Sequence, residues 1–292
     1  MMINLKTAAA IAGIALAAAV IAAVFFTRSP VLIVSDNSFM RLYGETRTRR
    51  ECSRISRALF RPVKIAAIAD DAGDDIVQFA VEDISSRPYC VLFPFRFAEA
   101  AHLYREQNPL VPVILLEGRS AENDELGSGD CFVYKTDIDA DFYRAGLTAA
   151  ALDGGKNGKI AVFLENPVQT QAKQAFLKAL NDLEMPLETL FFTSFSQYLE
   201  ISDLSCVVLA GAGSEYLEKN SGVPVIFFTW INPSLLPNDV VLVVDDSPWI
   251  QAVWAVRMAA ARVEQGVIQS KFQILNEEKI GREILRKMKK PG

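Results

Sequence analysis

Beyond Pro30 the chain alternates between short apolar runs, rich in β-branched residues, and longer amphipathic stretches. Each short run is nearly continuous in apolar residues and ends in small or polar residues, which is typical of buried strands. The runs are Val31–Ser35, Val63–Ala69, Cys90–Phe95, Val111–Glu117, Cys131–Lys135, Lys159–Glu165, Glu188–Thr193, Cys206–Ala210, Val223–Thr229 and Val240–Val244. Helical stretches between them include Phe39–Phe60, Asp74–Ile84, Ala140–Leu152, Thr170–Leu183 and Trp249–Gln265. This alternation predicts parallel sheets covered by helices on both faces.

The strands divide by spacing into two groups of about five, so we predict an α/β protein with two doubly wound, Rossmann-like lobes rather than one large sheet. Segment 131–141 would lead into the second lobe, 240–247 would lead back, and 267–275 would cross a third time. The expected N-terminal lobe comprises residues 31–137 and 247–266, and the expected C-terminal lobe residues 138–246 and 267–292. Multiple crossovers are expected because no low-complexity linker separates the two groups.

The first 30 residues contain an uninterrupted apolar run from Ala8 to Phe26. As a helix it would span about 28 Å at about 1.5 Å per residue, close to the hydrocarbon thickness of about 30 Å. It is longer than the usual signal-peptide core of about 7–15 residues. An uncleaved transmembrane helix is therefore favoured over a cleaved signal peptide, with cleavage after Ala23 as the alternative. Lys6 favours an inside amino terminus and Arg28 opposes it; the Sec-type layout favours an extracytoplasmic (periplasmic) protein tethered to the cytoplasmic membrane through residues 8–26.

Composition narrows the function classes. The formal net charge of -5 gives no indication of a nucleic-acid partner. With His102 as the single histidine, a histidine triad or a multi-histidine metal site has almost nothing to draw on. The four cysteines show no metal-ligand spacing, and buried thiols are favoured over a disulfide; they are Cys52, Cys90, Cys131 and Cys206.

Three predicted strand ends carry candidate binding residues, because ligands of open α/β sheets sit outside the carboxyl ends of strands. Asp36 to Ser38 can cap a helix, and Phe39 is either a core residue or an aromatic platform for a sugar or a base. Glu117 and Arg119 offer acceptors and forked donors for hydroxyl groups, or form a surface ion pair with each other. Asp245 and Asp246 precede a proline and equally fit an ordinary helix cap.

Other motifs predict little chemistry. The turn Gly211-Ala212-Gly213 follows a strand but lacks the third glycine and the lysine of phosphate-binding loops, so tight-turn geometry explains it better. No nucleophile elbow and no nucleophile–base pair stand out. We therefore expect neither an enzyme nor a cofactor, and no metal. The arginine-rich stretch Arg41–Arg61 is most simply a solvated helix face, with a lipid-facing or permease-facing patch as the alternative.

Taken in order, these segments resemble the type I periplasmic-binding-protein superfamily, which includes ribose and galactose receptors, nucleoside receptors of the basic-membrane-protein type and the effector domains of lac-repressor-like regulators. The resemblance covers most of residues 31–266. Its motifs are Leu32–Phe39, Val111–Arg119, Lys135-Thr136-Asp137 leading to Phe142–Gly146, and Val243–Pro248.

The resemblance implies a ligand site between the lobes, built from Asn37, Phe39, Phe95, Glu117, Arg119, Asp137, Gln171, Trp230 and Asp246. Phe39 matches the aromatic residue that follows the first strand of sugar receptors. The arginine expected on the second lobe is absent from 169–176, where Gln171 or Lys173 stands nearest. Trp230 replaces the acid expected after Val223–Thr229, which puts a ribose-like specificity in doubt.

The leading hypothesis is a solute receptor that binds a sugar or nucleoside-like ligand and delivers it to an ABC permease or a membrane sensor. The alternative is a membrane-anchored interaction or sensor module with a degenerate pocket, which the poor second-lobe contacts favour. An enzyme on a doubly wound fold is a third reading. A lac-repressor-like regulator is disfavoured because the apolar segment takes the place of a DNA-binding helix-turn-helix.

Overall fold

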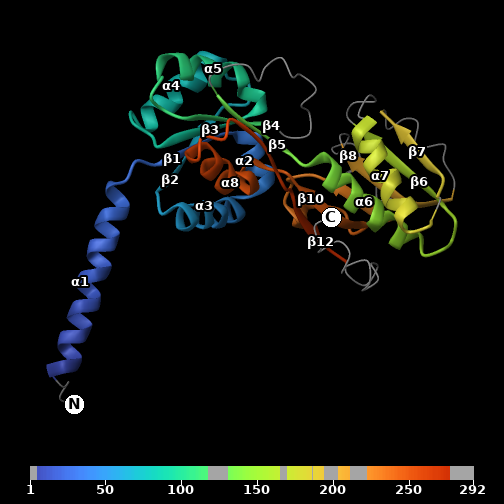
Figure 1. Cartoon of the computed structure of the whole chain (residues 1–292), viewed down its shortest axis with the longest axis horizontal. Coiled ribbons are helices and arrows are strands. Elements are labelled where there is room, and N and C mark those ends of the chain that lie inside the picture. The colour runs from blue at the N-terminus through green and yellow to red at the C-terminus, as the bar shows by residue number, and fades with distance from the viewer. Residues whose placement is uncertain are drawn as a thin grey trace.

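The computed structural model describes residues 5–117, 131–164, 170–185, 187–193, 203–210 and 222–276, with side chains from Gly13 onward. In this part of the chain, two six-stranded sheets form two lobes. A long amino-terminal helix extends away from the first lobe (Figure 1). The predicted α/β architecture with two sheets, each dominated by parallel strands, is confirmed.

The first lobe is built on an entirely parallel sheet with the strand order β2-β1-β3-β4-β5-β11. Its strands are β1 (Val31–Asp36), β2 (Val63–Ile68), β3 (Cys90–Pro94), β4 (Val113–Glu117), β5 (Phe132–Thr136) and β11 (Gln265–Ile268). Its helices are α2 (Asn37–Tyr43), α3 (Glu45–Leu59), α4 (Asp74–Ile84), η1 (Phe95–Phe97), α5 (Ala98–Gln107) and α8 (Pro248–Ala260). Separate apolar cores cover the two faces, one beneath α2, α3 and α8 and one beneath α4 and α5.

The second lobe repeats this strand order as β7-β6-β8-β9-β10-β12, with β12 antiparallel to β10. Its strands are β6 (Lys159–Leu164), β7 (Thr189–Phe192), β8 (Leu204–Ala210), β9 (Val225–Phe228), β10 (Val240–Asp245) and β12 (Lys271–Ile274). The elements α6 (Ile138–Asp153), α7 (Thr170–Asp182) and η5 (Pro233–Leu235) belong to it. Helices α6 and α7 pack closely because Gly146 has no side chain; a Cβ there would lie 2.6 Å from the carbonyl oxygen of Phe176.

Two predicted helices differ from the structure: one is interrupted and one ends earlier than the pattern indicates. The predicted helix over Phe39–Phe60 is two helices that meet at Gly44, whose φ of 93° only glycine adopts readily. The predicted helix over Trp249–Gln265 ends at Ala260, and Gln265 starts strand β11 instead. Both differences arise from short backbone features that hydropathy does not record.

Helix α1 (Leu5–Thr27) carries exposed apolar side chains along its described part. Its carboxyl end rests on the first lobe, where the rings of Phe25 and Phe60 lie 5.6 Å apart. Among the described side chains, which begin within this helix at Gly13, no helix is both long and apolar enough to cross a membrane. The predicted transmembrane helix therefore finds no support in that part of the chain.

Three short segments carry the chain between the two sheets: Asp137, residues 246–247 and residues 269–270. The Asp137 carboxylate accepts a hydrogen bond of 2.9 Å from the Ala140 backbone N–H and so caps α6. The Ser270 hydroxyl donates to the buried Asp141 carboxylate at 2.6 Å. The Gln251 side-chain amide donates to the Asp246 carbonyl oxygen at 2.6 Å. Each crossover is thus fixed by hydrogen bonds at its end.

The four cysteines are free thiols, and three of them are buried, as the sequence pattern predicts. Burial raises the pKa of Cys90 to about 12 and that of Cys52 to about 11, so neither forms a thiolate at neutral pH. Among the described residues no group of histidine, cysteine and acidic side chains has the arrangement of a metal site.

Candidate functional site

The carboxyl ends of the first sheet gather charged and hydroxyl side chains. Asp36 at the end of β1 forms an ion pair with Arg96 at 2.8 Å, and its other oxygen accepts from the Phe39 backbone N–H at 2.7 Å. The Ser38 hydroxyl and backbone N–H both donate to Asp70, at 2.6 and 2.8 Å. These two hydrogen bonds lower the pKa of the Asp70 carboxyl. Because Asp36 caps α2, it holds Phe39 in the first turn of that helix.

Phe39 lies in an aromatic cluster that joins the two lobes. Its ring centroid is 4.5 Å from that of Trp230, which follows β9 of the second lobe. On the first-lobe side, Phe39 stacks on Tyr43 at 5.3 Å and approaches Trp249 at 6.5 Å. Only 8% of the Phe39 surface remains exposed. Two residues predicted for the ligand site, one from each lobe, therefore lie in direct contact.

A buried ion pair reinforces this contact between the lobes. Arg47 of α3 pairs with Asp245 at the end of β10 and also donates to the Trp230 carbonyl oxygen at 3.0 Å. The guanidinium lies 4.1 Å from the Tyr43 ring centroid. Burial raises the pKa of the Asp245 carboxyl, against the opposing effect of the Arg47 charge. Removing either partner would leave the other charge buried without compensation.

The prediction of a solvated face for the arginine-rich stretch is wrong at Arg47. This side chain is buried against the β9–β10 connection of the second lobe, where it donates to the carbonyl oxygens of Trp230 at 3.0 Å and Ile231 at 3.4 Å. A signal was present in the sequence: Arg47, Glu51 and Ile55 follow one another at a spacing of four and are all buried. Hydropathy overlooks this stripe because most of its members are polar.

The remaining predicted residues take various positions. Glu117 ends β4 and is buried, and Asp246 is buried in the second crossover. Phe95 is half-buried in η1, and Asn37 is exposed at the start of α2. The Gln171 amide donates to Asp139 of α6 at 2.8 Å, and Asp139 lies two residues beyond the crossover at Asp137. Arg119 lies outside the described residues.

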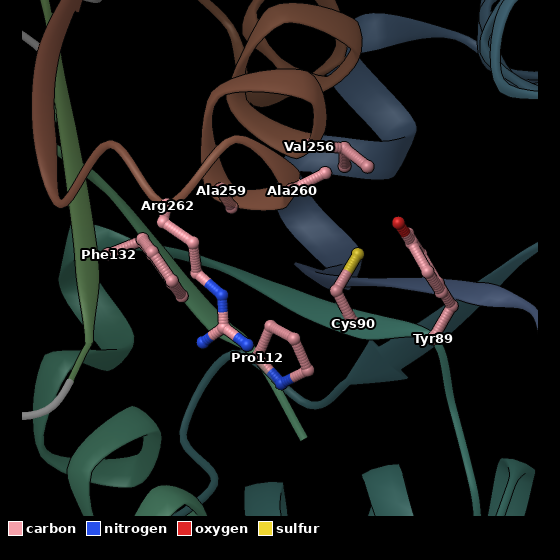
Figure 2. A pocket seen from close by; sticks show the side chains of 8 residues that line it. All are labelled: Tyr89, Cys90, Pro112, Phe132, Val256, Ala259, Ala260 and Arg262. Carbon is pink, nitrogen blue, oxygen red and sulfur yellow. The ribbon is translucent and has the colours of Figure 1, made fainter. Parts of the chain in front are cut away.

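A cavity of about 200 Å³ lies elsewhere, at the amino ends of strands β3, β4 and β5. It is lined by Tyr89, Cys90, Pro112, Phe132, Val256, Ala259, Ala260 and Arg262. Figure 2 shows α8 above it and the Arg262 side chain extending from the end of that helix beside Phe132 and Pro112. Since ligand sites of open α/β sheets lie at the opposite, carboxyl ends of the strands, this cavity is separate from the candidate site.

Two lobes of the same strand order, three crossovers and strand carboxyl ends that meet at Phe39 and Trp230 define the type I periplasmic-binding-protein fold. No family model matches the chain, and no curated protein matches it in sequence. Solved structures do match.

A transcriptional activator of the comK gene from Bacillus halodurans is similar with a TM-score of 0.62 and 14% identity, over 89% of this chain and 95% of that one. A periplasmic solute-binding protein from Actinobacillus succinogenes with bound D-allose gives 0.57 and 14%, over 86% and 99%. The arabinose-binding protein AraP from Geobacillus stearothermophilus gives 0.59 and 13%, over 86% and 97%. At such identities the likeness establishes the fold alone.

Proposed function

We propose that this protein is an extracytoplasmic solute-binding protein that holds a small polar ligand, a sugar in the first instance, between its two lobes. The observation that carries the proposal is the contact between Phe39 and Trp230, from opposite lobes, beside the polar carboxyl edge of the first sheet. Similar structures with this fold include proteins described as binding D-allose and arabinose. Neither those structures nor this one supports an enzymatic reading over a binding one.

In the proposed mechanism, opening of the lobes separates Phe39 from Trp230, and a sugar ring then stacks between them. Aromatic rings bind the apolar face of a sugar, while a few convergent polar groups fix its orientation. Glu117 and Asn37 from the first lobe and Gln171 from the second are the proposed polar contacts, with Asp137 and Asp246 at the crossovers and Phe95 and Arg119 beside the first-lobe edge. Closure would be a hinge motion that a partner recognises.

The test is isothermal titration calorimetry of the full chain against pentoses, hexoses and nucleosides. Phe39→Ala and Trp230→Ala should each weaken binding of the recognised ligand about tenfold or more, because each removes one face of the aromatic sandwich. Phe79→Ala is the matched control: Phe79 is 73% exposed on α4, so its loss should leave affinity unchanged. A response to ligand that all three variants retain equally would refute this site.

A second candidate is an interaction or sensor module whose pocket is filled by its own side chains. The same geometry favours it, since Trp230 covers the ring of Phe39 and Arg47 occupies the adjoining space with Asp245. If the native chain binds none of the pentoses, hexoses or nucleosides, this second candidate is supported. Binding that emerges only in Trp230→Ala would identify Trp230 as the residue that blocks the pocket.

We further propose that α1 tethers the lobes to the cytoplasmic membrane, next to an ABC permease or a sensor subunit. The whole helix of 23 residues is about 34 Å long at about 1.5 Å per residue, and its sequence from Ala8 to Phe26 has no charge. Val20→Lys combined with Ile14→Lys should release the protein from membranes in a carbonate wash, because a lysine at mid-membrane costs about 2.5–3.5 kcal/mol. Retention of that variant in the pellet would argue against the tether.

The lobe boundaries that accompany this function are also proposals: residues 31–137 with 247–266 for the first lobe and 138–246 with 267–292 for the second. A third crossover near this boundary is supported by the pairing of β11 with β5, which runs to Ile268.

A further inference from the structure

The base of the first lobe, where α1 leaves it, carries a group of arginine and aromatic side chains, most of them exposed and two of them, Arg61 and Tyr89, half-buried. We call it the basal face and define it as Arg28, Arg57, Phe60, Arg61, Tyr89, Trp254, Arg257 and Arg262. It lies at the amino ends of the strands, whereas the candidate ligand site lies at their carboxyl ends. Trp254 is 59% exposed and Phe60 39% exposed, so both apolar side chains are accessible to a partner surface.

Direct contacts make these residues one continuous surface. Arg28 lies 4.9 Å from the Phe60 ring and donates to the Phe60 carbonyl oxygen at 3.3 Å. Arg257 lies 5.7 Å from the Trp254 ring and donates to the carbonyl oxygen of Ala58, near the end of α3. The Arg61 guanidinium lies 3.6 Å from the Tyr89 ring centroid. Tyr89 and Arg262 both line the cavity at the amino ends of β3, β4 and β5 (Figure 2).

Among the described residues, no acid forms an ion pair with the arginines of this face. Arg28, Arg57, Arg61 and Arg257 donate to backbone carbonyl oxygens. Glu264, which is exposed and immediately precedes β11, is an acid close in sequence to Arg262. The chain as a whole has a formal net charge of -5, so this cluster is a local reversal of charge.

The face also has a fixed position relative to α1. Phe25, in the last turns of α1, contacts Phe60 at 5.6 Å, and the Arg61 guanidinium donates to the Ser29 carbonyl oxygen at 3.3 Å. Arg28 links the same two segments through the Phe60 carbonyl oxygen. The apolar helix therefore emerges beside the basal face and is held there by ring contact and hydrogen bonds.

We propose that the basal face binds the surface of an anionic lipid bilayer, an inference that rests on the tether proposed above. Guanidinium groups pair with lipid phosphates through two parallel hydrogen bonds. Tryptophan and tyrosine favour the boundary between headgroups and acyl chains. Arginines and exposed aromatic rings around the exit of an apolar helix provide both parts of that recognition. Docking on this face would direct the candidate ligand site away from the lipid.

Tryptophan fluorescence gives a direct test with the full chain reconstituted in vesicles. Trp249 is fully buried and Trp230 lies between the lobes, so quenching by lipids with brominated acyl chains reports on Trp254. We expect strong quenching when the vesicles contain about 30% phosphatidylglycerol, and weak quenching in phosphatidylcholine alone, because surface attraction of arginines requires anionic lipid. Trp254→Phe should abolish the difference between the two lipids.

The triple variant Arg57→Gln, Arg257→Gln and Arg262→Gln should shift the ratio of docked to undocked protein about a hundredfold, at about fivefold for each arginine. The matched control is Arg41→Gln, Arg49→Gln and Arg50→Gln, which removes the same charge from α2 and the first half of α3. It should dock like the native chain. Unchanged far-ultraviolet circular dichroism and melting temperature would show that both variants remain folded.

The outcomes separate docking from tethering. Equal quenching in both lipids, or equal loss in the two triple variants, would overturn the basal face as a lipid site, and an acidic protein partner would then be the better occupant. Flotation of the protein with neutral vesicles tests the tether through α1 alone, because neutral lipid does not attract the arginines of the basal face. A chain that fails to float with neutral vesicles, yet shows quenching that depends on anionic lipid and on the basal arginines, would refute the tether and uphold the docking face.

Discussion

The two lobes share a strand order but use their charged side chains differently. In the first lobe, Arg47 reaches across to Asp245 of the second, and Asp36 and Asp70 organise the carboxyl edge of the sheet. In the second lobe, Asp153 is used internally: it is buried and accepts hydrogen bonds from the N–H groups of residues 155, 157 and 158 and from the Ser205 hydroxyl. Both lobes therefore contribute to the contact between them, but charged side chains organise the carboxyl edge in the first lobe, whereas Asp153 stabilises the second lobe from within.

This difference suggests a division of labour in ligand recognition. The described carboxyl edge of the first sheet offers carboxylates, a guanidinium and hydroxyl groups, whereas the described end of β9 offers Phe228 and Trp230. Hydrogen-bonding groups discriminate between hydroxyl patterns more sharply than apolar surfaces do. We expect the first lobe to set ligand specificity and the second to supply apolar contact on closure.

The largest effect should come from breaking the link between the lobes. Arg47→Ala leaves Asp245 buried without its partner and should lower the free energy of unfolding by about 3–5 kcal/mol, measured by urea denaturation. Arg49→Ala is the control, because its ion pair with Glu45 is exposed and worth about 1 kcal/mol or less. Similar losses in the two variants would show that burial gives Arg47 no special role.

The next largest effect should come from Asp153 and the four hydrogen bonds that it accepts, which we call the internal clamp of the second lobe. Asp153→Ala removes the acceptor of four hydrogen bonds and leaves backbone N–H groups without partners, so it should cost about 3 kcal/mol. If the lobes are independent in this respect, the loss should add to that of Arg47→Ala within about 0.5 kcal/mol. A clearly non-additive double variant would mean that the clamp and the interlobe pair are coupled.

The same residue predicts a dependence on pH. Burial alone would raise the pKa of the Asp153 carboxyl, but the hydrogen bonds from Ser205 and from the N–H groups of residues 158, 157 and 155 outweigh it, and the pKa is lowered. A lowered pKa stabilises the folded state above the ordinary value of 3.8, and this contribution is lost as the pH falls through the folded-state pKa. The gap in stability between the native chain and Asp153→Asn should therefore narrow below about pH 4. A gap that is constant between pH 7 and pH 3 would contradict this.

A smaller effect is expected at Gly44, between α2 and α3. Its φ of 93° is strained for any residue with a Cβ, and that atom would lie 2.9 Å from the Asn232 amide nitrogen of the other lobe. Gly44→Ala should cost about 1–3 kcal/mol. Asn232→Ala in the same chain should relieve only the part of this cost that comes from contact between the lobes. Full relief would mean that backbone strain contributes nothing.

The layered fold could be predicted well from the sequence because parallel strands that are buried on both faces consist of nearly continuous apolar residues. The sequence pattern missed β11 and β12, whose four residues each are mostly polar or half-exposed. It predicted Phe39 and Trp230 for the ligand site, yet not that they touch, because contact across lobes depends on how the crossovers orient them. Arg47 escaped notice for the same reason: nothing local shows that a partner carboxylate lies 198 positions away.

The three crossovers have a mechanical consequence. Asp137, residues 246–247 and residues 269–270 are links of one or two residues, each held by hydrogen bonds at its end. Several short links side by side between two lobes resist twisting and sliding of one lobe against the other, but they permit hinge bending. We therefore expect the relative motion of the lobes to be limited to a change in one angle between them, with little twist.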